Sequence, residues 1–294
     1  MLDAPSIALL LVAAITAGVA AYLGLFQPLA APSATSGSGD PSRHATPAPQ
    51  IFFVGAFAVY TAWMLAGLLI QALSGQAPAA SDPSPASPSI DLAARTQGLM
   101  LLLAVPSAVA TFWWVHRGSS RPVRFELAKA LPATLVAFGW AFVTLPFVFA
   151  IGMTAKRVSE SLGQPVDQAA HSTLKMIVDD QGSLASRVVL IACAVIGAPI
   201  LEELCYRGLF QRGITAVTRS HWAGVLITST LFTAMHIGVI PSGSFWPAAS
   251  MLFSLSMLLG LLLARTGSVI TTIVIHGLFN AANIAMALSS QGNA

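Results

Sequence analysis

The stretch VVLIACAVIGAPILEELCYRG, residues 188–208, decides how this chain is interpreted. Its first fourteen residues are apolar enough to lie inside a membrane. Two adjacent glutamates, Glu202 and Glu203, follow at once, and Arg207 comes shortly after them. The chain has only four glutamates, so half of them lie here. Because carboxylates at membrane depth are costly and usually functional, the stretch predicts a membrane helix that carries a site.

The composition predicts a membrane protein. Of the 294 residues, 55% are hydrophobic and 9% are charged, and the mean hydropathy is +0.77. Soluble domains carry about a quarter charged residues. We therefore expect an all-α fold, a polytopic membrane helical bundle with the lipid bilayer as its main partner. The formal charge of +3 is spread over many loops and does not interleave with aromatic residues, which argues against a nucleic-acid partner.

Eight apolar segments predict about eight transmembrane helices. The first carries Asp3 and no Lys or Arg on its flank and is long enough to span, so we expect a helix and not a signal peptide. Pro199 lies inside the fifth segment and predicts a kink there. The expected segments are Ile7–Phe26, Ile51–Leu73, Gly98–His116, Leu131–Met153, Arg187–Gln211, Trp222–Ile240, Ala248–Ala264 and Ser268–Leu288.

The chain divides into three parts. Residues 1–96 hold two helices with linkers (31–50 and 74–89) rich in Pro, Ala and Ser, which we expect to be flexible. Residues 97–186 hold two helices and a mixed segment, 155–186, that reads equally well as an interfacial helix pair or a solvated loop. Residues 187–294 hold four helices and every candidate site residue, so we expect them to form the catalytic core.

Basic residues predict the orientation in the membrane. Three loops on one side of an eight-helix topology carry seven of them, so we assign these loops to the cytoplasm and both termini to the opposite side. We expect the plasma (inner) membrane as the location. The seven residues are Arg117, Arg121, Arg124, Lys129, Arg212, Arg219 and Arg265.

The first polar cluster is the glutamate pair with its arginine. Glu203 and Arg207 are four residues apart, so they share one helix face and can form an ion pair. Glu202 points about 100° away from Glu203 and can face a different neighbour. A position at a helix end in water is the competing interpretation, but apolar sequence resumes directly after Gly208.

Two further helices carry isolated polar groups. His236 lies one turn after Phe232 in an apolar segment, and His276 shares a helix face with Asn280. Either group alone could be a packing residue or an interhelical contact. Counted by helical rise from the basic loops, however, both histidines and Glu202 fall about 12–21 Å into a core about 30 Å thick. Because a desolvated polar group needs a partner, we expect the three helices to meet there.

This set of side chains supports hydrolysis of an amide by an activated water. A carboxylate beside an imidazole can deprotonate water, so Glu202 is the expected base and His236 the residue that orients the water. His276 and Asn280, one turn apart, can donate together to a developing oxyanion. The Glu203–Arg207 pair would then brace the site.

Two other chemistries use the same region. Glu202, His236 and His276 match the donor types of a catalytic zinc site, although their spacing is not the short pattern of a helix-borne one. We therefore prefer a mechanism that requires no cofactor and keep zinc as the alternative. Cys205 as nucleophile is disfavoured, because a buried apolar cysteine is usually inert.

These motifs resemble those of a known family. EELCYR at Glu202–Arg207, Phe232–His236 and His276–Asn280 are similar, in order and spacing, to the EExxxR, FxxxH and HxxxN motifs of the CPBP intramembrane proteases. This is the type II CAAX prenyl endopeptidase or Abi family. The resemblance covers residues 187–288 and leaves the first two helices unexplained.

The resemblance implies an intramembrane endopeptidase whose cavity opens toward the cytoplasm, acting on a peptide or lipidated protein substrate, with prenylated CAAX proteins among the candidates. It implies the roles given above for the six motif residues. The family is often labelled metalloprotease, and a metal-free glutamate mechanism is the competing view. Two other functions stay open: a non-catalytic scaffold or bacteriocin-immunity protein, and a proton-coupled transporter. The transporter is less favoured because only one broken helix is predicted and no internal repeat is visible.

Overall fold

The structure is a computed structural model that describes residues 4–27, 29, 47–73, 89–117, 130–164, 166, 172–179 and 182–291. These residues form helices and turns and contain no strand. Seven helices within them are long and apolar enough to cross a membrane, and Leu10–Tyr22 is a shorter apolar helix. The prediction of a polytopic helical membrane bundle is confirmed.

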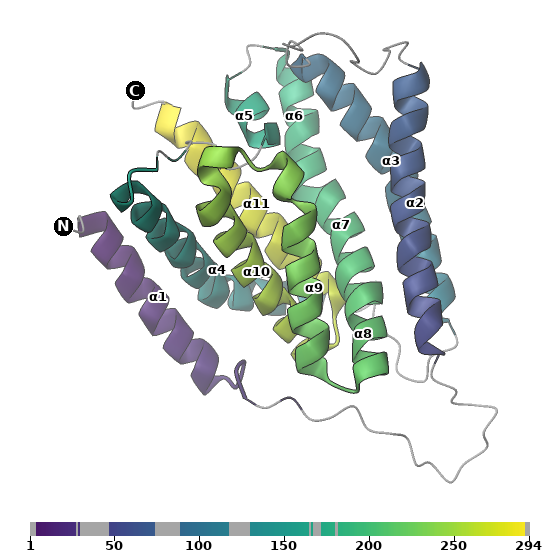
Figure 1. Cartoon of the computed structure of the whole chain (residues 1–294), viewed down its shortest axis with the longest axis horizontal. Helices are drawn as coiled ribbons and strands as arrows, with labels where there is room; N and C mark the ends of the chain where they lie inside the picture. Colours follow the sequence, from purple (N-terminus) through teal and green to yellow (C-terminus); the bar gives the residue numbers. More distant parts are fainter. Residues whose placement is uncertain are drawn as a thin grey trace.

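The first four long helices run alternately along the bundle (Figure 1). α1 is shorter than predicted and ends at Tyr22, whereas α3 begins eight residues earlier than predicted and α4 continues eight residues further. α1 packs along α4, and α2 packs along α3. The four are α1 (Ala4–Tyr22), α2 (Pro49–Leu73), α3 (Ile90–His116) and α4 (Ala130–Ser161).

The segment between α4 and the fifth span contains one short helix, α5 (Ser172–Asp179). Its buried Ile177 packs in a cluster with Ile90 of α3 and Leu190 of the fifth span. Of the mixed segment, which was predicted to be either an interfacial helix pair or a solvated loop, the described residues contain the end of α4 and α5. Its remaining residues lie partly outside the described ones, as do most of the two predicted linkers.

The fifth span is broken twice into π-helical turns. It runs through α6 (Leu184–Ala192), η2 (Cys193–Gly197), α7 (Ala198–Glu203), η3 (Leu204–Phe210) and α8 (Gln211–Thr218). Both η2 and η3 are π-helical, so each accommodates an extra residue in its turn. The irregularity predicted at Pro199 occurs at the start of α7, directly after η2.

Three more helices complete the core. α9 (His221–Met235) is followed by two 3₁₀ turns, η4 (Ile237–Val239) and η5 (Ser242–Ser244), and then by α10 (Phe245–Thr266) and α11 (Val269–Gln291). Gly267 has φ of +66° in the tight turn between α10 and α11, a conformation that favours glycine. α10 packs against α4, α9 and α11, and α11 also packs against α4.

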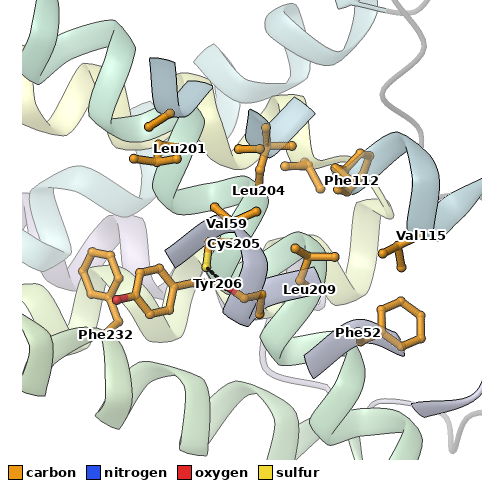
Figure 2. Close-up of a cluster of buried hydrophobic side chains, with 14 of the residues drawn as sticks. Phe52, Val59, Phe112, Val115, Leu201, Leu204, Cys205, Tyr206, Leu209 and Phe232 are labelled. Atoms are coloured by element: carbon orange, nitrogen blue, oxygen red, sulfur yellow. Dashed lines mark hydrogen bonds between the residues drawn. The ribbon is translucent and has the colours of Figure 1, made fainter. Parts of the chain in front are cut away.

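A hydrophobic cluster joins the first helices to the broken span (Figure 2). Leu204 and Leu209 of η3 are fully buried and lie near Phe112 of α3 and Val59 of α2. Cys205 also belongs to this cluster, and its Sγ lies 3.9 Å from the carbonyl oxygen of Ala56. Since lipid is as apolar as leucine, close packing and not transfer from water must hold these helices together.

Candidate active site

Three helices bring a glutamate and two histidines together. Glu202 comes from α7, His236 is the residue that caps the C-terminus of α9, and His276 lies in the second turn of α11. The Nε2 atoms of both histidines lie 3.9 Å from the same atom, Glu202 Oε2. The three side chains are between 4% and 17% exposed. The convergence predicted from the depth of these residues is therefore present.

A second network lies behind the first. Glu203 Oε1 lies 3.2 Å from the Arg207 guanidinium and 3.0 Å from Nδ1 of His276, and both charged side chains are fully buried. Arg207 Nη2 donates to the hydroxyl of Ser256 on α10 at 2.8 Å, and its guanidinium lies 4.8 Å from the centre of the Phe232 ring. The predicted ion pair is thus formed. The sequence did not single out Ser256, since a serine in an apolar helix carries no distinguishing signal.

Hydrogen bonds at Nδ1 orient both imidazole rings. The other nitrogen of His236, Nδ1, lies 2.7 Å from the carbonyl oxygen of Phe232, to which it donates. His276 Nδ1 donates likewise to Glu203. In each ring Nε2 is therefore left to face Glu202, whose buried Oε2 has no hydrogen-bond partner among the described residues. Two atoms 3.9 Å apart are too distant for a direct hydrogen bond, and one water can bond to both.

Asn280, the second expected oxyanion donor, uses its side-chain amide in a hydrogen bond to the backbone. Its Nδ2 donates to the carbonyl oxygen of Ala194, in η2, at 2.8 Å. Asn280 still lines the cavity together with His276, and one N–H of its amide is used in the bond to the Ala194 carbonyl. Asn283, one turn further along α11, donates to the carbonyl of Phe279 in its own helix.

The catalytic candidates line a cavity of about 440 Å³. Glu202, His236, His276 and Asn280 form its polar wall. Helices α2 and α3 also line the cavity, mostly with apolar side chains, and this contribution was not predicted from the sequence. No local signal could have revealed it, because it depends on how distant helices pack. These wall residues are Tyr60, Trp63, Met64, Gln97, Met100 and Leu101.

The donor types at Glu202, His236 and His276 suit zinc, but their spacing does not. Zinc ligands at about 2.0–2.2 Å in a tetrahedron lie about 3.4 Å from one another, whereas both histidine nitrogens lie 3.9 Å from the carboxylate. Within the described part of the chain, no group of three or more His, Cys, Asp or Glu side chains is arranged to hold a metal ion.

The position of the cavity bears on the predicted orientation. Thr173, Leu174 and Ile177 of α5 line the cavity, which therefore extends toward the end of the bundle where α5 and the start of α6 lie (Figure 1). Arg219, after α8, and Arg265, near the end of α10, lie at the opposite end. The orientation predicted from charge and the cytoplasmic opening implied by the family resemblance both stay predictions.

One family model matches part of the chain. Residues 184–282 match the family model described as "Type II CAAX prenyl endopeptidase Rce1-like". The match covers about a third of the chain and contains all six motif residues, from Glu202 to Asn280. It confirms the resemblance to the CPBP proteases for this segment. No curated protein and no solved structure matches the chain.

Proposed function

We propose that this protein is an intramembrane endopeptidase that hydrolyses peptide bonds of membrane-associated substrates, with lipidated CAAX-type proteins as the substrate class to test first. The observation that carries the proposal is the meeting of both histidine Nε2 atoms at Glu202 Oε2 inside a membrane-embedded cavity. The family match over residues 184–282 supports the same activity at family level. Carboxylates and imidazoles gathered at this depth indicate function.

In the proposed mechanism, Glu202 and His236 activate the water. A water between them donates one proton to Glu202 Oε2 and is oriented by Nε2 of His236. As Glu202 takes the proton, the water oxygen forms a bond to the carbon of the scissile carbonyl. The protonated Glu202 then delivers this proton to the leaving nitrogen as the carbon–nitrogen bond breaks. The products are a carboxylic acid and an amine, and Glu202 is restored.

His276 is the proposed electrophile. Its Nδ1–H donates to Glu203, and carboxylates flank the ring on both sides. When Nε2 of the ring is also protonated, its N–H can donate to the oxyanion of the tetrahedral intermediate. Arg207 pairs with Glu203, and Ser256 and the Phe232 ring in turn contact the Arg207 guanidinium. The fully buried pair therefore sets the ring orientation of His276 without meeting the substrate.

Cleavage of defined peptides tests the proposal. The protein, purified in detergent and reconstituted in vesicles, is incubated with matched prenylated and plain peptides carrying a C-terminal CAAX sequence, and fragments are identified by mass spectrometry. We expect cleavage of at least one peptide of the panel. A folded protein that cleaves none of them and keeps its cellular effect after Glu202→Gln would support the scaffold or immunity function instead.

Chelation separates the two forms of water activation. We expect the initial rate to change by less than about twofold after dialysis against a strong chelator, because no group of three or more His, Cys, Asp or Glu side chains in the described part of the chain is arranged to hold a metal ion. The measurement is the rate before and after dialysis, with metal content determined on the same sample. A loss of activity that added zinc restores would contradict the metal-free mechanism.

A further inference from the structure

The break in the fifth span leaves one backbone carbonyl without its helical donor. The N–H of Ala198 donates to the carbonyl of Cys193, a bond between residues five apart. The next bond in this register would run from residue 199 to the carbonyl of Ala194. Residue 199 is a proline and has no N–H. In a membrane interior such a carbonyl must find another donor.

Asn280 of α11 supplies that donor. Its Nδ2 lies 2.8 Å from the oxygen of Ala194, a bond that joins residues 86 apart in the chain. The two helices approach closely at this level. A Cβ atom on Gly277 of α11 would lie 2.6 Å from the carbonyl oxygen of Val195, so only glycine fits there. α11 therefore packs directly against the backbone carbonyls of Ala194 and Val195 in the π-helical turn η2.

We propose that Asn280 is a positioning residue that replaces the hydrogen-bond donor removed by Pro199. The bond ties two catalytic elements together. Glu202 lies three residues after Pro199 in the same short helix, α7, and His276 lies one turn before Asn280 on the same face of α11. The Asn280–Ala194 bond thereby fixes the register of α11 on α7. That register sets the 3.9 Å separation between His276 Nε2 and Glu202 Oε2.

This role differs from oxyanion donation, and the two make different predictions. If Asn280 acts through Ala194, the loss of activity in Asn280→Ala depends on whether residue 199 has a backbone N–H that can donate a hydrogen bond. If Asn280 acts on the oxyanion, that loss is independent of residue 199. Asn283 provides a matched control, because it lines the same cavity from the same helix but donates only within α11.

A double-mutant cycle between Asn280→Ala and Pro199→Ala tests the proposal. We expect Asn280→Ala to lower kcat/KM about 100-fold in the parent, the upper range for loss of a residue that supports a site from behind. In the Pro199→Ala background the backbone N–H at position 199 can donate to the carbonyl of Ala194, so we expect a loss of less than about 10-fold. Asn283→Ala should change kcat/KM by the same factor in both backgrounds, because Asn283 donates to Phe279 and not to Ala194. Equal losses from Asn280→Ala in the two backgrounds would overturn the proposal.

Hydrogen exchange provides a second readout that does not require activity. The double-mutant cycle on kcat/KM rests on the proposed peptidase function. The hydrogen-exchange measurement tests only the bond between Asn280 and Ala194. We expect amide exchange in residues 193–203 to rise at least about 10-fold in Asn280→Ala and to return to within about threefold of the Pro199→Ala level in the double variant. If Asn280→Ala does not accumulate, the double variant should accumulate. Unchanged exchange in a folded Asn280→Ala protein, or failure of both variants to accumulate, would contradict the positioning role.

Discussion

Glu202→Gln is expected to lower kcat/KM by between about 100-fold and 10,000-fold, the range that general acid–base catalysis contributes. Glutamine has nearly the same shape but cannot take a proton from the water that faces His236. Glu202 is partly exposed to the cavity and its Oε2 has no hydrogen-bond partner among the described residues, so the substitution breaks no bond of the fold that the structure shows. The measurement is the cleavage rate of a quenched fluorescent peptide by the purified variant.

Glu160→Gln is the matched control for this substitution. Glu160 lies at the end of α4, about half-exposed and 3.8 Å from Lys156, far along the chain from the motif helices. It should retain parental turnover and parental thermal stability. If Glu202→Gln retained more than about a third of parental kcat/KM in a sample that melts like the parent, Glu202 could not be the base. A parental cellular effect without any cleavage would then favour a scaffold.

The helices and the polar clusters were accessible from the sequence because both depend on local patterns. Apolar segments of membrane-spanning length predicted the spans, and a spacing of four residues predicted the pair between Glu203 and Arg207. The common depth of Glu202, His236 and His276 followed from helical rise alone. A buried polar group needs a polar partner whichever helix supplies it, so the neighbours of each helix need not be known in advance.

The remaining features depend on contacts between distant helices. Asn280 shares a face with His276, which suggested a joint role at the oxyanion, yet its partner is a carbonyl in another helix. Pro199 predicted a kink, but the π-helical form of η2 and η3 depends on how the span packs. The sequence also does not predict that Trp63 and its neighbours in α2 line the cavity. An aromatic residue in an apolar helix can equally well face lipid.

Removing one member of the buried ion pair is expected to have the largest effect on stability. Glu203 and Arg207 are both 0% exposed, so either single substitution leaves an uncompensated charge inside the bundle. We expect Glu203→Gln and Arg207→Met each to lower the free energy of unfolding by about 3–5 kcal/mol. His276 remains beside Glu203 in the second variant, and Ser256 remains beside Arg207 in the first. Neither residue replaces the missing full charge at the same position.

The double variant separates charge from packing. With both charges removed together, no charge of this pair is stranded, so we expect the combined loss to be at least about 2 kcal/mol smaller than the sum of the single losses. Lys156 and Glu160 form the matched pair, with the same spacing of four residues but nearly half-exposed side chains. Their coupling should be at most about 1 kcal/mol, because water screens an exposed pair. Unfolding followed in detergent supplies all of these values, and additive losses at Glu203 and Arg207 would show that the two charges do not support each other.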